Sequence, residues 1–472
     1  MIFDATFIKE ALNPTLTGDH SGQQNIPFTG LSIDTRTLKP GEIYAALRGD
    51  RLDGHRFIPH AIEAGCSAII AERQPDQPVD IPVFLVPDTL DALSRLGHAW
   101  RERIAPRVIA ITGSSGKTTV KEMVTACLKQ RYKTHATQGN FNNHIGVPLT
   151  LLNMPTETEV LVVEMGMSAA GEIDHLTKLA RPDIGVVTNI MPAHMAAFES
   201  LEDIARAKSE LPAALPDDGI AILPARDRFA DLLEMVSQAP IRWFDVKPRD
   251  DSRNPADQIV LIGTPVLENG RFCFSMQRQD KILPISLSYP GSHMVANALA
   301  AAEVGFQMDL TAQEIIDGLS DFKLPAGRGE MHSCLGGWTV VDDTYNANPG
   351  SMRSALRLLD RYLTPSGSGR RIAILGDMLE LGEEEDKRHA RLTNVIQDSR
   401  IQGLFTAGKC MAALHHEAQN LPGLITGHHD DPAQWLDGSL LKQLQPGDVI
   451  LVKGSRGMRM ERIVEALRAR KA

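Results

Sequence analysis

Cysteine is scarce in this sequence, with 5 among 472 residues. No two cysteines have the C-x-x-C spacing of a zinc or redox motif, and they stand far apart, at Cys66, Cys127, Cys273, Cys334 and Cys410. An odd number of scattered cysteines argues against a disulfide framework and against a zinc site. This cysteine usage favours a reducing compartment.

Long hydrophobic runs are absent as well, and no apolar run approaches the ~20 residues that a membrane-spanning helix requires. The N-terminal stretch, MIFDATFIKEALN, lacks the basic region and apolar core of a signal peptide. Basic residues are in the minority, since 49 lysines and arginines face 59 aspartates and glutamates, for a net charge of −10. We therefore expect a cytoplasmic protein without a membrane span and without a nucleic-acid partner.

The remaining composition is that of a globular chain, with 43% hydrophobic and 23% charged residues. A chain of 472 residues exceeds what one hydrophobic core normally supports, so two to four domains are expected. Changes in pattern place three domains at residues 1–87, 88–325 and 326–472. No internal repeat or low-complexity tract interrupts them.

Alternating strands and helices dominate the second and third regions. Residues 159–166 (EVLVVEMG) and 183–190 (DIGVVTNI) are short apolar runs of the kind found in buried parallel strands, and an amphipathic helix follows each. From about residue 250 the pattern changes to longer alternating strands. The third region repeats strand and helix again, so both regions predict doubly wound parallel sheets.

A phosphate loop is the clearest motif. Residues 108–124, VIAITGSSGKTTVKEMV, form an apolar strand, a Gly/Ser loop and the start of a helix. Gly113 and Gly116 let backbone N–H groups turn toward an anion at the positive end of the helix dipole. Lys117 would reach the terminal phosphates, and the Thr118 hydroxyl would bind Mg²⁺. Ile111 stands where the usual motif has glycine, so a plain strand–turn–helix junction is the alternative.

Other polar residues fall where the same sheet edge is expected. Glu164 ends an apolar strand and could bind a metal, or it could be a surface acid. His194 follows the next strand, at the edge where ligands bind in such sheets, although a single histidine is more often a packing or surface residue. Lys208 lies on a helix and could belong to a solvated face. Asn297 shares a helix face with His293, which fits a ligand contact or an ordinary surface.

Together these residues resemble the Mur ligase family of ATP-dependent amide-forming enzymes. The resemblance covers nearly the whole chain, and the shortened phosphate loop is the family's own form. Its markers in the first half are DTR (34–36), ALRGDRLDGH (46–55), TGSSGKTT (112–119), GNFNNHIGVP (139–148), EMGM (164–167) and AHMAAF (193–198). Further markers are AK (207–208), GSHMVANALAA (291–301), DDTYNANPGSM (342–352), LGDMLELG (375–382) and VKGSR (452–456).

The resemblance implies a fold and a reaction. The expected fold is α/β, with a small α/β N-terminal domain that binds UDP-muramoyl substrate, a central P-loop-type parallel sheet with an added antiparallel part, and a Rossmann-like C-terminal domain. The expected reaction joins D-alanyl-D-alanine to UDP-N-acetylmuramoyl-tripeptide through an acyl phosphate, using ATP and two Mg²⁺ ions. The resemblance also implies a monomer, the usual state in this family.

Two rival functions remain as alternatives. The family member that adds the third amino acid typically carries a DNPR motif, which this sequence lacks. A P-loop GTPase switch would normally show an N-K-x-D motif, which is also absent. The dipeptide-adding reaction is therefore favoured.

The resemblance also assigns roles to individual residues. The catalytic residues would be Lys117, Glu164, His194 and Lys208. The metal ligands would be Thr118, Glu164, His194 and, if carbamylated, Lys208. ATP would be bound by Gly113, Ser114, Ser115, Gly116, Lys117, Thr118, Thr119, Asn297, Arg328, Asp343, Tyr345 and Asn346. The nucleotide-linked substrate and the dipeptide would be bound by Ser32, Asp34, Thr35, Arg36, Arg48, Gly49, Asn142, Asn143, Lys453, Ser455 and Arg456.

Overall fold

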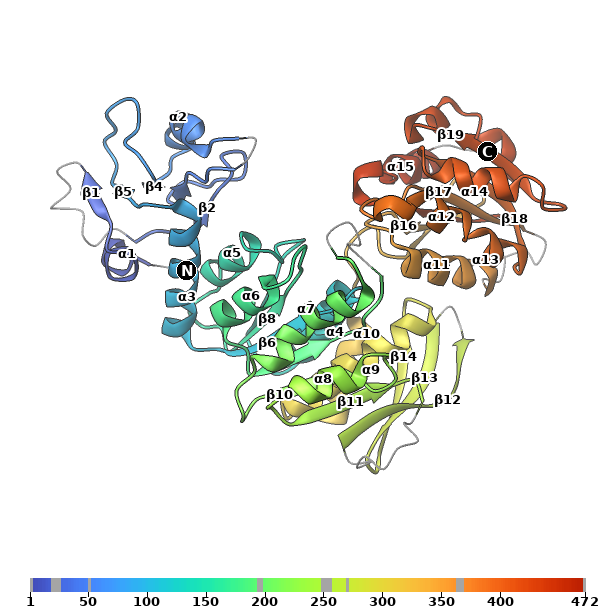
Figure 1. The fold of residues 1–472 in the computed structure, drawn as a ribbon, viewed down its shortest axis with the longest axis horizontal. Coiled ribbons are helices and arrows are strands. Elements are labelled where there is room, and N and C mark those ends of the chain that lie inside the picture. The colour runs from blue at the N-terminus through green and yellow to red at the C-terminus, as the bar shows by residue number, and fades with distance from the viewer. Residues whose placement is uncertain are drawn as a thin grey trace.

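Three β-sheets follow one another along the chain in the computed structural model (Figure 1). The structure describes residues 3–17, 27–49, 52–192, 198–247, 257–268, 271–361 and 369–469. Strands of the first sheet lie between Thr15 and Leu85, those of the second between Arg107 and Leu287, and those of the third between Glu330 and Lys453. The predicted three-domain α/β fold is confirmed, whereas the predicted domain boundaries stay predictions.

The first sheet has five strands in the order β1-β5-β4-β3-β2, parallel except for β1. The strands are β1 Thr15–Thr17, β2 Leu31–Ser32, β3 Ile43–Ala45, β4 Ala68–Ala71 and β5 Val83–Leu85. The helices are α1 Ala5–Leu12, α2 Ile58–Glu63 and, leading into the second sheet, α3 Thr89–Ile104. Because Phe3 and Phe7 pack on Trp100 of α3, the first region and the second share one hydrophobic core.

The second sheet has nine strands in the order β14-β13-β12-β11-β10-β9-β6-β8-β7. Its strands are β6 Arg107–Thr112, β7 Thr134–Ala136, β8 Val160–Glu164, β9 Ile184–Val187, β10 Ile220–Pro224, β11 Ile241–Asp245, β12 Gln258–Glu268, β13 Arg271–Arg278 and β14 Lys281–Leu287. The seven strands β6 to β12 are parallel to one another. Strands β12, β13 and β14 pair antiparallel and form the antiparallel part that the sequence predicted.

Helices cover this central sheet: α4 Lys117–Leu128, α5 Gly146–Leu152, α6 Glu172–Ala180, α7 Leu201–Ala213, α8 Ala230–Val236, α9 Ser292–Gln307 and α10 Ala312–Asp321. Two of these helices begin with a capping box, in which a Ser or Thr side chain and an acidic side chain three residues later exchange hydrogen bonds with the backbone. Ser200 and Asp203 form the capping box of α7, and Thr311 and Glu314 form that of α10.

The third sheet has the order β15-β16-β20-β17-β18-β19 and is parallel except for β15. Its strands are β15 Glu330–Ser333, β16 Thr339–Asp343, β17 Arg371–Gly376, β18 Ile401–Ala407, β19 Ile425–His429 and β20 Val449–Lys453. Its helices are α11 Pro349–Arg361, α12 Glu385–Ala390, α13 Thr393–Gln397, α14 Met411–Ala418 and α15 Glu461–Ala469. Short 3-10 helices lie at Gly54–Phe57, Gly382–Glu384, Pro432–Asp437, Leu441–Gln443 and Arg456–Met458.

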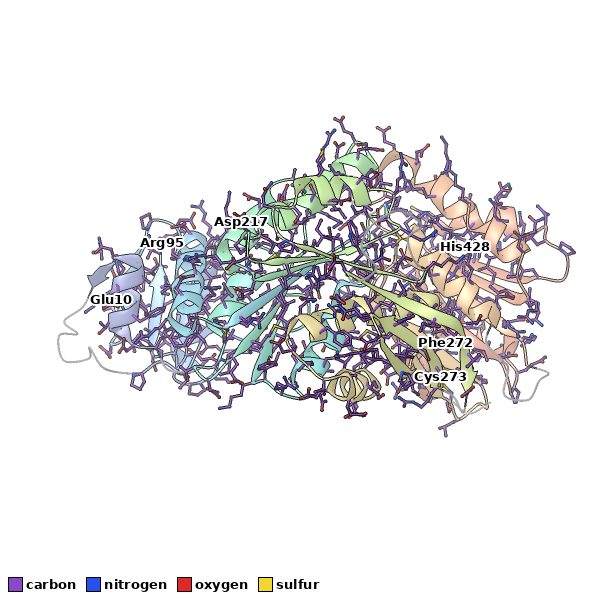
Figure 2. All side chains as sticks on the ribbon, turned by 90° about the horizontal axis from the view of Figure 1, so that it is seen from below. Glu10, Arg95, Asp217, Phe272, Cys273 and His428 are labelled. Carbon is purple, nitrogen blue, oxygen red and sulfur yellow. The ribbon has the colours of Figure 1, made fainter. Side chains whose placement is uncertain are left out.

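The first and third regions lie at opposite ends of the molecule, with the nine-stranded sheet between them (Figures 1 and 2). Figure 2 shows Glu10 at one end and His428 at the other. Arg95 of α3 lies beside the first region, where its guanidinium donates to the Ala11 carbonyl at 2.8 Å. Within the described residues, no helix is long and apolar enough to cross a membrane.

Candidate active site

Three parallel strands bring the predicted phosphate loop and its acidic partner to one edge of the central sheet. Ile111 of β6 is in register with Glu164 of β8 on one side and with Val186 of β9 on the other. The segments that follow these strands therefore leave the sheet at the same edge, where ligands bind in open α/β sheets. The alternation of apolar strands and helices in the sequence dictates this arrangement.

The two glycines of the phosphate loop occupy positions that exclude a side chain. Gly113 has φ +143°, and a Cβ there would lie 1.9 Å from Thr188 Oγ1. Gly116 has φ +84° and is the N-cap residue of α4, and a Cβ there would lie 2.7 Å from Asn297 Oδ1. The structure thus places the predicted nucleotide contact Asn297 directly beside the phosphate loop. The alternative of a plain junction does not account for this close packing around both glycines.

Asn189, which sequence reasoning missed, holds the middle of the loop. Its Oδ1 accepts from the Ser115 N–H at 3.0 Å, its Nδ2 donates to the Ser115 carbonyl at 2.9 Å, and its own carbonyl accepts from the Ser114 N–H at 3.0 Å. The Thr188 hydroxyl also donates to the Ser115 carbonyl, at 2.6 Å. The signal that could have revealed both residues is their place directly after β9, at the same sheet edge.

Lys117 begins α4 and lies across the loop. Its ammonium donates to the Gly113 carbonyl at 2.8 Å. Desolvation lowers the pKa of Lys117, the nearby Glu164 carboxylate opposes this, and the Arg328 guanidinium adds to it. A phosphate oxygen at this place would be a stronger hydrogen-bond partner for the Lys117 ammonium than the Gly113 carbonyl is.

Glu164 is the acidic centre of the site and is only 2% exposed. Its Oε2 accepts from the Thr118 hydroxyl at 2.8 Å, and its Oε1 accepts from Asn142 Nδ2 at 2.8 Å. Thr119, the next predicted loop residue, is also buried, on the same first turn of α4. The structure therefore brings together Thr118 and Glu164, which are predicted metal ligands, and Asn142, which is a predicted substrate contact.

The donor set at Glu164 fits a hard cation such as Mg²⁺. A buried carboxylate and a threonine hydroxyl are oxygen donors of the kind that Mg²⁺ prefers, and the two side chains that hydrogen-bond to the Glu164 carboxylate among the described residues are uncharged. No group of three or more His, Cys, Asp or Glu side chains capable of holding a metal occurs within the described ranges. The predicted ligand His194 lies outside the described residues.

Lys208 lies on α7 with its side chain 2% exposed. The part of the chain that the structure describes provides no hydrogen bond or ion pair to its ammonium. Desolvation lowers the pKa of Lys208 well below its usual value, and the positive charge of Lys117 lowers it further. Of the two possibilities that the sequence left open, a solvated helix face is therefore wrong.

The start of the third region reaches the phosphate loop through Arg328. Its Nη2 donates to the Thr118 hydroxyl at 2.9 Å, and its guanidinium lies over the Tyr345 ring at 3.8 Å from the ring centre. Its two neighbours, Gly327 and Gly329, have φ +79° and +84°. The predicted nucleotide contacts Arg328 and Tyr345 are thus joined to each other and to α4.

The predicted residues at the ends of β16 and β20 form a second group. The Lys453 ammonium is buried and bonds to Asp343 Oδ2 at 2.8 Å and to the Asn346 carbonyl at 2.9 Å. Ser455 is buried and donates to the Ala347 carbonyl at 3.3 Å. Arg456 is exposed and lies 3.8 Å from a carboxylate oxygen of Glu461.

The predicted substrate residues of the first region follow two paired strands. Ser32 ends β2 and residues 33–36 follow it, residues 48–49 follow β3, and these strands are parallel, so both segments leave one edge of the first sheet. Arg36 donates to both carboxylate oxygens of Asp34, at 2.9 and 2.6 Å, and this hydrogen bonding lowers the pKa of Asp34.

The remaining residues of this group vary in exposure. Ser32 and Thr35 are half-buried, and Arg48 and Gly49 are exposed. In the second region, Asn143 accepts from the Gly146 N–H at 2.9 Å and so supports the first turn of α5. No contact joins these first-region residues to the phosphate loop within the described segments.

Comparison with known proteins identifies the family. The chain matches the Mur ligase family catalytic domain at residues 27–101, the Mur ligase middle domain at 111–305 and the Mur ligase glutamate ligase domain at 327–456. It is 38% identical over 441 residues to the UDP-N-acetylmuramoyl-tripeptide–D-alanyl-D-alanine ligase of Bacillus subtilis, and the alignment covers 93% of each chain. The chain belongs to the Mur ligase family.

Other Mur ligases extend the similarity. The ligase of the same name from Escherichia coli is 35% identical over 458 residues, covering 97% of each chain. A crystal structure of MurF from Acinetobacter baumannii has a TM-score of 0.87 at 29% identity, covering all of this chain and 99% of that one. MurF of Thermotoga maritima, solved with ADP, has a TM-score of 0.78 at 29% identity, covering 93% and 97%. The predictions of a Mur ligase fold and of a ligase are confirmed.

Proposed function

We propose that this Mur ligase joins D-alanyl-D-alanine to UDP-N-acetylmuramoyl-tripeptide at the expense of ATP, giving the pentapeptide, ADP and phosphate for peptidoglycan synthesis. The observation that carries the proposal is the meeting of Lys117, Arg328 and the Thr118–Glu164 pair at one sheet edge, in a chain whose relatives bear that enzyme name. The absence of a DNPR sequence agrees with it.

The reaction has two chemical steps. A terminal carboxylate oxygen of the tripeptide attacks the γ-phosphorus of ATP, which forms an acyl phosphate and releases ADP. The neutral amine of D-alanyl-D-alanine then attacks the acyl carbon, loses a proton, and expels phosphate from the tetrahedral intermediate. No covalent bond to the protein is needed, so catalysis rests on positioning and electrostatics.

Two cations of the chain would oppose the repulsion between the anionic reactants. Lys117 would turn from the Gly113 carbonyl to the terminal phosphates, and the Arg328 guanidinium donates to the Thr118 hydroxyl on the same helix turn. A positive charge held near a transferring phosphoryl group stabilises the negative charge on its oxygens in the transition state. Asn189 would keep the Gly/Ser loop in shape, and the N–H groups of the loop that do not donate to Asn189 would bind the phosphates.

Thr118 and Glu164 would hold Mg²⁺ with the nucleotide, and His194 would complete the set as the sequence resemblance implies. The ion would supply positive charge between the phosphates. Glu164 would be kept in place by Asn142, which donates to the oxygen that does not contact Thr118.

A second Mg²⁺ would use Lys208 after reaction of its amine with carbon dioxide. Carbamylation needs a neutral amine, and the lowered pKa of Lys208 makes that form more abundant near neutral pH. The reaction would convert the buried neutral amine into a carboxylate-like carbamate anion and release one proton. Burial of an amine without a carboxylate partner among the described residues supports this role.

The third region would close over ATP and the incoming dipeptide. Asp343, Asn346 and Lys453 lie together at the strand ends of the third sheet, and the Arg328–Tyr345 pair links that region to α4. The nucleotide-linked substrate would bind the first region through Arg48 and the segment 32–36. We also propose a cytoplasmic monomer.

The test is substrate-dependent ADP release. We expect release only when ATP, Mg²⁺, UDP-N-acetylmuramoyl-tripeptide and D-alanyl-D-alanine are all present, together with a product whose mass equals that of the pentapeptide. Rapid release with free amino acids in place of the dipeptide, or with neither peptide substrate, would overturn the assignment. Tripeptides ending in diaminopimelate and in lysine should be compared in the same assay.

A further inference from the structure

Lys121 is a buried cation that the proposed reaction does not use. It lies on α4, one turn after Lys117, and only 2% of it is exposed. Its ammonium donates to the Thr137 carbonyl at 2.6 Å and pairs with Glu122 Oε1, also at 2.6 Å. Burial of an ammonium costs several kcal/mol unless its partners compensate, so a structural lysine at this depth needs a reason.

Thr137 joins three elements through its own hydrogen bonds. It is 1% exposed and follows the last residue of β7. Its N–H donates to the Val162 carbonyl at 3.0 Å, its hydroxyl oxygen accepts from the Glu164 N–H at 3.0 Å, and its carbonyl accepts from Lys121. Thr137 is therefore fixed to β8 on one side and to α4 on the other.

The Lys121–Thr137 hydrogen bond joins the two segments that carry Thr118 and Asn142, the side chains that hydrogen-bond to the Glu164 carboxylate. Thr118 comes from α4, three residues before Lys121, and Asn142 comes from the loop that begins at Thr137. A change in the distance between α4 and that loop would therefore change the distance between Thr118 and Asn142. The Lys121–Thr137 bond is the direct link across this spacing.

We infer that Lys121 is a positioning residue that fixes Glu164 between Thr118 and Asn142, and so sets the affinity of the site for Mg²⁺ with nucleotide. The inference rests on the proposed function, because it takes Glu164 as a metal ligand. Lys121 itself touches neither substrate nor metal. The ammonium, rather than an apolar side chain, is needed because the Thr137 carbonyl is buried and faces it.

Lys121→Met tests this role, since it keeps the length of the apolar stem and removes the donor. Binding of a fluorescent ADP analogue should be measured with and without Mg²⁺. We expect nearly unchanged binding without Mg²⁺ and a Mg²⁺ requirement raised about 10–100-fold, the effect typical of residues that orient metal ligands. Hydrogen exchange in residues 137–146 should increase. Lys129→Met, an exposed lysine at the end of the same helix, should match the wild type.

Thr137→Val provides a second variant that removes only the hydroxyl. We expect the same raised Mg²⁺ requirement and, in the double variant with Lys121→Met, an effect smaller than the sum, since both act along one path. If Lys121→Met lowers only thermal stability and its Mg²⁺ response equals that of the wild type, the inference is overturned while the proposed function stands. If Lys121→Met does not fold, an unchanged Mg²⁺ response in Thr137→Val overturns the inference. A wild-type protein whose nucleotide binding ignores Mg²⁺ would overturn both.

Discussion

Some side chains of the active site could be predicted from the sequence next to them, whereas others depend on contacts with distant segments. Lys117, Thr118 and Glu164 could be predicted because each stands at a fixed place in a short pattern, a glycine loop or the end of an apolar strand. Asn189 and Lys121 could not, because their roles depend on Ser115 and Thr137, which lie far away in sequence. A hydrogen bond between distant segments produces no repeating pattern in the sequence from which it could be predicted.

Lys117→Met should abolish most of the activity. The change removes a cation that lies within reach of the phosphates, and loss of one such stabilising group typically costs about 10²–10³ in kcat. The measurement is kcat for ADP release with saturating substrates, with Lys129→Met as the control. Activity within a few-fold of the wild type would show that Lys117 does not act on the transferring phosphoryl group.

Lys208→Met should change how stability depends on pH. Because folding lowers the pKa of Lys208, the unfolded chain binds more protons between the folded pKa and the ordinary value of about 10.4. Stability of the wild type relative to Lys208→Met should therefore rise with pH across that window and level off above it. Denaturant unfolding in bicarbonate-free buffer without Mg²⁺ measures this, and a constant difference between about pH 7 and 10 would refute it.

Elements were predicted well where their pattern was local. The apolar runs became β8 and β9, and the segment from about residue 250 became the antiparallel part of the sheet. A turn lies at Pro40–Gly41 between β2 and β3, yet these two strands are parallel to each other. Strand direction and register are set by packing between distant segments, so the sequence pattern alone could not supply them.

Gly113→Ala should separate nucleotide binding from folding. A Cβ at this position would lie 1.9 Å from Thr188 Oγ1, so the loop between β6 and α4 must move. We expect at least a tenfold loss of nucleotide affinity, because small displacements at a reacting group are costly. The control is Gly423→Ala, which has a similarly unfavourable φ of +76° but no neighbour within 4 Å of the added Cβ.

Both glycine variants should lose stability, about 1–2 kcal/mol for Gly423→Ala from backbone strain alone. Calorimetric titration with ADP and denaturant unfolding measure the two effects. Equal nucleotide affinity in the Gly113→Ala and Gly423→Ala proteins would contradict the assigned role of the loop.

The regions proposed to bind the nucleotide-linked substrate and the dipeptide lie far apart, although the proposed reaction must bring these two substrates together. The first region, with Arg48, and the third, with Lys453, lie at opposite ends of the central sheet (Figures 1 and 2). The sequence predicted domain boundaries near residues 88 and 325, and Gly327 and Gly329 have positive φ close to the second. Local sequence patterns carry no information on how separate domains are placed relative to one another, so this placement could not be derived from them.

Ligand-driven closure follows from this arrangement. We expect the radius of gyration, measured by small-angle scattering, to fall when a non-hydrolysable ATP analogue, Mg²⁺ and UDP-N-acetylmuramoyl-tripeptide are added together. Nucleotide alone should cause a smaller change. An unchanged radius with all three present would exclude closure as the means of keeping water from the acyl phosphate.

The most direct test of the account follows one oxygen atom. UDP-N-acetylmuramoyl-tripeptide labelled with ¹⁸O in both oxygens of its reacting carboxylate should be incubated with ATP, Mg²⁺ and D-alanyl-D-alanine, and the phosphate and peptide products analysed by mass spectrometry. Ligation through an acyl phosphate predicts one ¹⁸O in each phosphate released and one in the new amide. Unlabelled phosphate, or ADP formed without pentapeptide, would contradict the central claim.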